Sequence, residues 1–153
     1  MGCHWPRHLA RDHRDLVPCL LWACFIWGNS LVPGGVSTLG SDKVAELALP
    51  AFSLLGVAEV RLMTLVVRKL AHLFEYAVLG GLVGGPASPP RMASRAAFFL
   101  VPVVDEALQL LVPGRSGMLG DVVLDLAGML LGLLVAVAWR RIVTRRSTVL
   151  TEQ

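Results

Sequence analysis

Four long apolar segments constrain this chain more than any other feature of its sequence. Each is close to the ~20 residues that an α-helix needs to cross a lipid bilayer. Of the 153 residues, 55% are apolar and 16% are charged, which lies outside the usual range of soluble globular proteins. We therefore predict an all-α, polytopic membrane protein with four transmembrane helices, at Leu16–Val32, Val66–Gly84, Ser94–Val112 and Leu119–Trp139.

The second segment is the weakest of the four, because it contains four ionisable residues, Arg68, Lys69, His72 and Glu75. A helix on the membrane surface is therefore the alternative for this segment. Before it, Pro33-Gly34-Gly35 predicts a turn, and Ser41-Asp42 is a candidate cap for a helix over Val44–Val57. That helix is too short to cross a bilayer and contains Pro50, so we predict a short interfacial or re-entrant helix between the first and second spans.

Basic residues predict the orientation, since they collect on the cytoplasmic side of membrane proteins. They precede the first segment, separate the second from the third, and follow the fourth: Arg7, Arg11, Arg14, Arg91, Arg95, Arg140, Arg141, Arg145 and Arg146. Both termini are thus predicted to be cytoplasmic. The chain divides into a basic N-terminus (1–15), one transmembrane domain (16–139) and a basic tail (140–153). Because the positive charge lies at segment ends and on no single face, we expect no nucleic-acid partner.

In this topology the polar residues of three segments fall in the outer half of the membrane. Charged groups at membrane depth are costly and usually face one another or a watery cavity. At ~100° per residue, Arg68, His72 and Glu75 share one stripe of the second helix, with Lys69 and Tyr76 beside it. Pairs spaced i,i+3 and i,i+4 that only satisfy buried charges are the structural alternative. The other segments contribute Asp105, Glu106 and Gln109, then Asp121 and Asp125.

Two further features belong to the fourth helix and the turn before it. Gly128-x-x-x-Gly132 lies on the same stripe as Asp125 and is typical of helices that pack closely, which favours a structural role for both glycines. In the turn, Arg115 can bind a carboxylate or phosphate in bidentate fashion, with Ser116 beside it. The alternative for Arg115 is a pair with lipid head groups at the interface.

Several carboxylates beside a histidine suggest acid and base chemistry. The candidates are His72 and Glu75, or Asp105 and Glu106, with Arg115 and Lys69 holding an anionic head group. The candidate binding residues are Lys69, Tyr76, Gln109, Arg115, Ser116, Asp121 and Asp125, and Arg68 is assigned a structural role. A histidine with carboxylates can hold a divalent metal, but no ligand pair such as HExxH is present, so we assign no metal ligand and no cofactor; a bound cation that balances the excess of carboxylates stays an open alternative. Nucleophile-elbow, P-loop and Rossmann patterns are absent from the sequence.

Together these stretches resemble the VanZ-like membrane proteins of bacteria. The resemblance covers about Leu20 to Ala136 and includes Trp27-Gly28-Asn29-Ser30-Leu31, Arg68-Lys69-x-x-His72-x-x-Glu75-Tyr76, Asp105-Glu106-x-x-Gln109, Pro113-Gly114-Arg115-Ser116-Gly117 and Asp121-x-x-x-Asp125. It adds Asn29 and Ser30 to the structural candidates. Gly28 and Asp125 depart from the family pattern, which has a bulkier residue at the first position and often Asn at the second.

The resemblance implies a small multi-pass protein of the bacterial cytoplasmic membrane. The protein that named the family is linked to low-level resistance to the glycopeptide teicoplanin. We expect an outer-leaflet site that acts on a membrane lipid, a lipid-linked wall precursor or a lipophilic glycopeptide. A proton- or cation-coupled transporter and a non-enzymatic binding protein are the alternatives. Whether the chain is an enzyme or forms a homo-oligomer is open at this stage.

Overall fold

The computed structural model describes residues 16–53, 60–85, 95–115 and 117–151. These residues form helices and turns without a β-strand, which confirms the predicted all-α fold. The helices are α2 (Val17–Ser30), α3 (Gly34–Ser53), α4 (Val60–Val83), the 3₁₀ turn η1 (Ala97–Leu100), α6 (Val101–Gln109) and α7 (Leu119–Thr151). The predicted N-terminal segment 1–15, with Arg7, Arg11 and Arg14, lies outside the described residues, as do Arg91 and Ser116.

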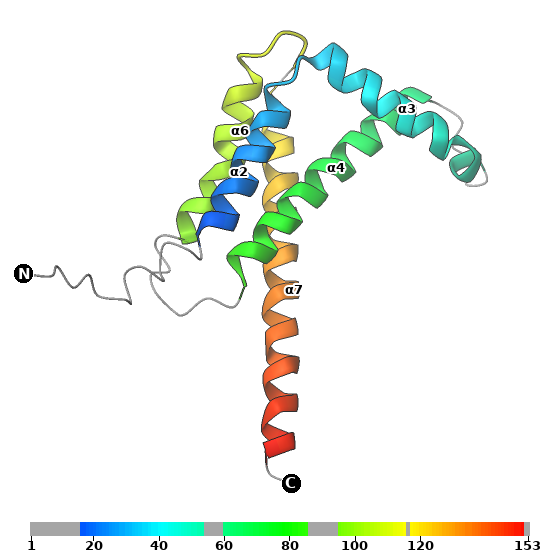
Figure 1. Ribbon diagram of the computed structural model, residues 1–153. Coiled ribbons are helices and arrows are strands. Elements are labelled where there is room, and N and C mark those ends of the chain that lie inside the picture. Colours follow the sequence, from blue (N-terminus) through cyan, green and yellow to red (C-terminus); the bar gives the residue numbers. More distant parts are fainter. Residues whose placement is uncertain (1–15, 54–59, 86–94, 116, 152–153) are drawn as a thin grey trace, which may run out of the picture.

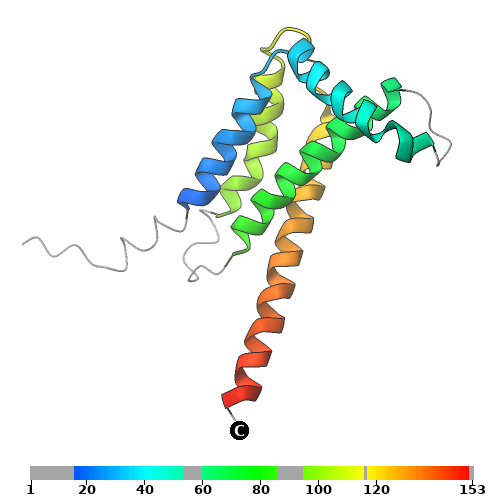
Figure 2. The same ribbon diagram turned by 45° about the vertical axis from the view of Figure 1, so that its right-hand side comes forward.

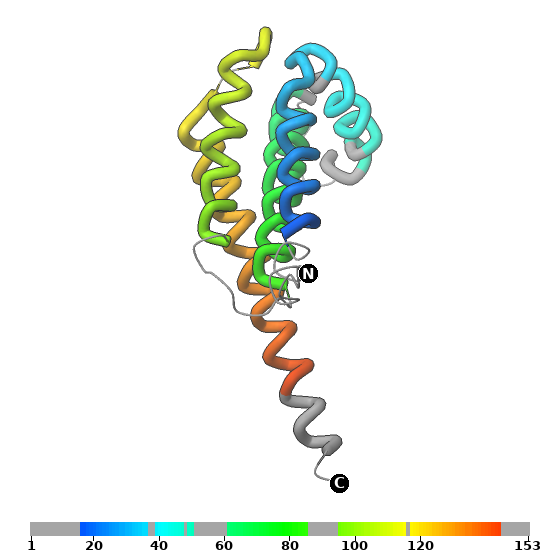
Figure 3. Tube along the Cα trace, turned by 60° about the vertical axis from the view of Figure 1, so that its left-hand side comes forward, coloured from blue at the N-terminus to red at the C-terminus, as the bar shows by residue number. Residues whose placement is uncertain are grey.

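Four helices lie side by side and pack as a ring, namely α2, α4, α6 and α7 (Figures 1 and 2). In this ring α2 contacts α4 and α6, and α7 also contacts α4 and α6. The fully buried side chains of Ile26, Tyr76, Leu79 and Met129 lie in the core between these helices. α7 continues well past the ends of the other helices (Figure 3).

α3 leaves the bundle at the end where α2 stops. The bend between α2 and α3 is 97°, and α3 packs across the first half of α4 (Figure 1). The corner contacts the turn between α6 and α7, where the Gly34 amide donates to the carbonyl of Pro113 at 3.2 Å. Gly114 in that turn has a φ of +76°, a conformation that glycine adopts without strain. The ends of α2 and α6 are thereby held together.

α4 and α7 make the most extensive contact, and glycines allow it. A Cβ atom at Gly80 would overlap the backbone carbonyl of Met129, and one at Gly132 would overlap that of Ala77. At Gly128 the added atom would lie 2.6 Å from the carbonyl oxygen of Leu73. The two helix backbones are therefore in direct contact, as in small-residue crossings of membrane helices.

α7 is the one described helix that is long and apolar enough by itself to cross a membrane. Its segment Leu119–Thr144 contains a window with a mean hydropathy of 2.3, of which only 22% is buried in the protein. α2 and α3 are long and apolar enough to cross a membrane only when they are counted together as one bent pair. α2 has 14 residues, and α6 has 9 residues after the short η1 turn. The four predicted spans thus correspond to the four bundle helices. Among the described helices, α7 is shown as a clear apolar span, and the other three are not.

The predicted start of the helix after the first span was wrong. α3 begins at Gly34, directly after Pro33, so Ser41 and Asp42 lie inside the helix and do not cap it. Asp42 accepts a hydrogen bond from the Thr64 hydroxyl at 2.7 Å, which ties α3 to α4. The helix also continues through Pro50 and has 20 residues, longer than predicted. The local sequence pattern assigned the Asp42 carboxylate to a helix cap, whereas in the structure it forms a hydrogen bond between two helices.

Candidate functional site

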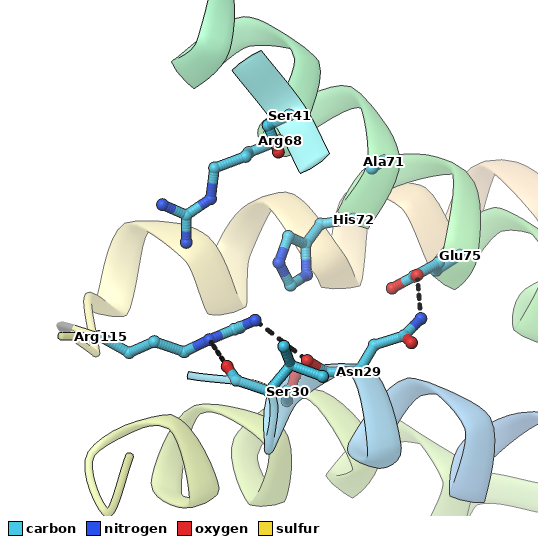
Figure 4. Close-up of a pocket in the computed structure, with 9 residues that line it drawn as sticks. Asn29, Ser30, Ser41, Arg68, Ala71, His72, Glu75 and Arg115 are labelled. Atoms are coloured by element: carbon cyan, nitrogen blue, oxygen red, sulfur yellow. Dashed lines mark hydrogen bonds between the residues drawn. The ribbon is translucent and has the colours of Figure 1, made fainter. Parts of the chain in front are cut away.

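A polar cavity of about 260 Å³ opens between α2, α3 and α4 (Figure 4). α4 presents Arg68, His72 and Glu75 to this cavity, because these residues recur at intervals of three and four along one face of the helix. The opposite wall is made by Asn29 and Ser30 at the end of α2 and by Arg115 from the α6–α7 turn. With Ser41 from α3, four separate parts of the chain supply its polar lining.

Arg115 closes one side of the cavity and also holds the end of α2. Its Nε donates to the carbonyl of Val32 and its Nη2 to the carbonyl of Asn29, each at 3.0 Å. The last carbonyls of a helix lack partners within the helix and carry partial negative charge, so a guanidinium stabilises them. Partial burial, followed by the nearby Arg68, lowers the pKa of Arg115, yet arginine stays protonated in proteins. Two bonds leave three of its five N–H groups for a ligand.

Glu75 is fixed by α2 from two directions. The side-chain amide of Asn29 donates to Glu75 Oε1 at 2.8 Å, as Figure 4 shows, and the indole of Trp22 donates to the Glu75 carbonyl, also at 2.8 Å. The Asn29 bond leaves the second carboxylate oxygen available to the cavity. Glu75 is thus a positioned acceptor or base, and Asn29 acts on it by orienting its carboxylate.

A second cavity of about 140 Å³ lies on the other side of His72. Arg68, His72 and Arg115 line both cavities, so the two cavities adjoin at these three side chains. Lys69 and Asp121 line the smaller cavity and are paired at 2.5 Å, with more than half of the Lys69 side chain exposed. Exposed ion pairs contribute little to stability, about 0 to 1 kcal/mol. This pair can therefore open to a ligand at low cost.

Behind His72 lies a buried group of polar side chains from three helices. Asp105 of α6 and Asp125 of α7 are 0% and 1% exposed, and Tyr76 on α4 is fully buried. Gln109 donates to Asp105 Oδ2 at 3.2 Å. The Nδ1 atom of His72 lies 3.9 Å from Asp125 Oδ1, beyond hydrogen-bond distance.

Glu106 occupies a different environment from Asp105, although the two are adjacent in sequence. Its Oε1 accepts a hydrogen bond from the backbone amide of Met118, just before α7 begins. A carboxylate at this position satisfies an amide at the N-terminus of a helix. Glu106 does not line the cavity of about 260 Å³, so the geometry favours a role in positioning α7.

The structure brings the predicted site residues of all three polar segments to one end of the bundle. His72, Glu75, Arg68, Arg115, Asn29 and Ser30 line the larger cavity, and Lys69, Gln109 and Asp121 line the smaller one. Tyr76, Asp105, Glu106 and Asp125 are buried beside them, whereas Gly128 and Gly132 lie in the α4–α7 crossing. Ser116 lies outside the described residues.

Sequence reasoning missed Ser41, which lines the larger cavity from α3, and Trp22, which holds Glu75. Ser41 was interpreted as part of a helix cap, and only the packing of α3 on α4 brings it to the cavity. Trp22 lies in an apolar run, where a tryptophan looks like one more lipid-facing residue. Its indole N–H, which needs a partner when buried, was the available indication.

The comparison with protein families gives a match between residues 16–140 and the model of the family described as VanZ/LLP1. The chain belongs to the VanZ/LLP1 family. The matched region contains α2, α4, α6 and the part of α7 up to Arg140, and every described residue of the two cavities. Neither the curated proteins nor the solved structures gave a match. VanZ/LLP1 membership, with the apolar helix α7, indicates a membrane protein linked to the cell envelope or to antibiotic resistance.

Proposed function

We propose that this VanZ/LLP1 protein spans the cytoplasmic membrane four times and binds the anionic head group of an envelope lipid or lipid-linked wall precursor at its outer face. The spans are α2, α4, η1 with α6, and α7, while α3 lies in the interface. Both termini are cytoplasmic in this arrangement. Bundle helices shorter than the bilayer core are accommodated by local thinning of the lipid and by snorkelling of basic side chains.

The positions of the basic residues support this orientation. Arg95 donates to the carbonyl of Val83 at 2.8 Å, and Arg140 lies 3.4 Å from the carbonyls of Gly84 and Gly85. Both therefore cap the end of α4 that is opposite the α6–α7 turn. Along α7, the fifteen residues from Asp125 to Arg140 correspond to about 22 Å. The basic end and the polar site thus lie at opposite ends of the bundle.

The observation that carries the proposed ligand is the pair of guanidinium groups, Arg68 and Arg115, facing the same cavity with His72 between them (Figure 4). Guanidinium groups bind phosphate through paired N–H donors. Among the described residues Arg68 has no ion pair, so its charge is available. A ligand phosphate would supply the missing counter-charge.

The size of the cavity fits a head group and excludes a whole lipid. Pockets that enclose drug-sized molecules have volumes of about 300–1,000 Å³. At about 260 Å³, this cavity is large enough for a phosphate or diphosphate with part of its substituent. The acyl or prenyl chain would lie outside it, along exposed apolar side chains such as Leu65 and Phe74 of α4 and Val36 of α3.

Binding and catalysis share these residues in the proposal. His72 and Glu75 line the cavity beside both arginines, so either can exchange a proton with a bound head group. Of the four acid and base candidates, these two have direct access to the larger cavity. In the non-enzymatic version the same residues recognise the head group and alter access of a glycopeptide to its target.

The first experiment measures binding of the purified protein, in detergent, to fluorescent analogues of phosphatidylglycerol and of an undecaprenyl diphosphate. We expect Arg68→Gln to weaken binding at least about tenfold, since loss of one charge-assisted hydrogen bond costs ~1.5–3 kcal/mol. Arg61→Gln is the matched control, because Arg61 is exposed on the same helix, one heptad away, and lines neither cavity. Equal affinities for the two variants would contradict the proposal.

A second readout tests the glycopeptide in cells. Teicoplanin and vancomycin susceptibility is compared between cells with wild-type protein, Arg68→Gln or Arg61→Gln at equal membrane abundance. Selective protection against teicoplanin that Arg68→Gln abolishes, without lipid binding in detergent, would make the glycopeptide the ligand. Protection by all three proteins would exclude the cavity from this effect.

A further inference from the structure

We propose that His72, Asp105 and Asp125 form a binding site for one divalent transition-metal cation, such as Zn²⁺ or Mn²⁺. Each residue offers a ligand atom within 4.8 Å of those of the other two. The three come from α4, α6 and α7, three of the four helices of the bundle. This site lies behind His72, as seen from the cavity of about 260 Å³.

Buried side-chain atoms without a hydrogen-bond partner indicate a cation site. Both oxygens of Asp125 are buried without a hydrogen-bond partner among the described residues, and so are Oδ1 of Asp105 and Nδ1 of His72. Leaving buried polar atoms unpaired is costly, and a buried carboxylate is the most costly case. These four atoms are all potential metal ligands. A single cation would satisfy them together.

The charges around Asp125 also favour a bound cation. The carboxylates of Asp105, Glu106, Asp121 and Glu75 all act on it, without a described ion pair to a lysine or arginine. Of the basic side chains that line the two cavities, Lys69 pairs with Asp121 and Arg115 holds the end of α2, while Arg68 has no described ion pair to Asp125. Negative charge is therefore concentrated on the side of Asp125, where a cation is favoured.

The distances permit a coordinated site after side-chain rotation. Two ligands at about 2.1 Å from one tetrahedral metal lie about 3.4 Å apart. His72 Nδ1 and Asp125 Oδ1, at 3.9 Å, are within about half an ångström of this separation. The widest separation within the group, up to 4.8 Å, needs a contraction of about 1.4 Å, which side-chain rotation can provide.

A supporting shell is already in place. Gln109 donates to Asp105 Oδ2 and so fixes that carboxylate with Oδ1 unoccupied. Outer partners of this kind orient metal ligands in proteins. One imidazole and two carboxylates favour zinc, manganese or iron, and three protein ligands leave a position open for water or a ligand oxygen. Residue spacing within one segment does not predict this ligand set, because the three ligands come from three different helices.

The test measures metal content, so it does not depend on the ligand proposed for the cavity. Full-length protein in detergent is treated with a chelator, dialysed against Zn²⁺ or Mn²⁺, and analysed for bound metal. We expect one equivalent per chain of at least one of these ions in the wild type. Asp125→Asn should bind at least about a hundredfold more weakly, since even loss of an outer-shell partner costs 10- to 100-fold.

Glu46→Gln is the control, because Glu46 is an exposed carboxylate on α3, away from the three ligands. Asp125→Asn nearly preserves the side-chain shape and removes a buried charge, so it should still fold. In a second measurement, Co²⁺ should give visible absorption bands in the wild type that shift in His72→Gln. Equal metal content in wild type and Asp125→Asn, or no metal in either, would overturn the proposal.

Discussion

Arg115 shows how one side chain can serve both the fold and the site. Its planar guanidinium reaches the Asn29 and Val32 carbonyls through two different nitrogen atoms. Lysine carries the same charge on a single nitrogen and cannot reproduce this fork. The residue therefore fixes the end of α2, and with it the position of Asn29 opposite Glu75.

This geometry makes Arg115→Lys a destabilising change although it conserves charge. Loss of one charge-assisted hydrogen bond should lower the free energy of unfolding by about 1.5–3 kcal/mol. Thermal unfolding in detergent measures the effect, with the exposed Arg141→Lys on α7 as the matched control. Equal unfolding midpoints for the two variants would mean that the paired hydrogen bonds of Arg115 are not needed to hold the end of α2.

At the residue scale, much of the polar set is predictable from sequence, but its internal partners are not. Arg68, His72 and Glu75 share a face of α4 because helical periodicity is local. The separation of Glu106 from Asp105 depends on where α7 begins, and the approach of Asp125 to His72 depends on how α4 and α7 cross. Both are properties of packing between helices, which residue spacing within one segment does not contain.

Among the elements, the α4–α7 crossing determines the depth and alignment of the site. His72 and Asp125 meet because the backbones approach at Gly80, Gly128 and Gly132. The G-x-x-x-G spacing predicted close packing on α7, whereas the partner glycine on α4 came from the structure. Helix boundaries were harder to predict, since Asp42 was assigned to a cap and is instead bonded to Thr64 on α4.

The crossing predicts opposite effects for two glycine substitutions on α7. Gly132→Ala should lower the free energy of unfolding by about 1–3 kcal/mol, because its Cβ overlaps the Ala77 carbonyl and forces the helices apart. Gly120→Ala meets no atom within 4 Å and should be neutral or stabilising by up to about 1 kcal/mol. Membrane abundance and thermal unfolding measure both. A stable Gly132→Ala protein would contradict the close approach.

For the whole molecule, the arrangement separates two kinds of surface. The polar cavities lie at the end formed by the α2–α3 corner and the α6–α7 turn, while Arg95 and Arg140 cap the opposite end of α4. The exposed sides of α7 are largely apolar, as a lipid-facing helix requires. Hydropathy predicted a membrane protein, and the distribution of basic residues predicted which helix ends lie on the same side of the membrane. The packing of the helices as a ring then shows that the polar segments contact one another.

The proposed orientation is tested by thiol labelling in intact cells. All three native cysteines are first replaced by alanine, and one cysteine is then introduced at either end. Leu111→Cys, 78% exposed in the α6–α7 turn, should react with a membrane-impermeant maleimide from outside. Arg141→Cys, two residues after the predicted fourth span ends at Trp139, should react only after permeabilisation, because basic residues stay on the cytoplasmic side. The reverse pattern would turn the polar cavities toward the cytoplasm, where an extracellular wall precursor or glycopeptide could not reach Arg68 and Arg115.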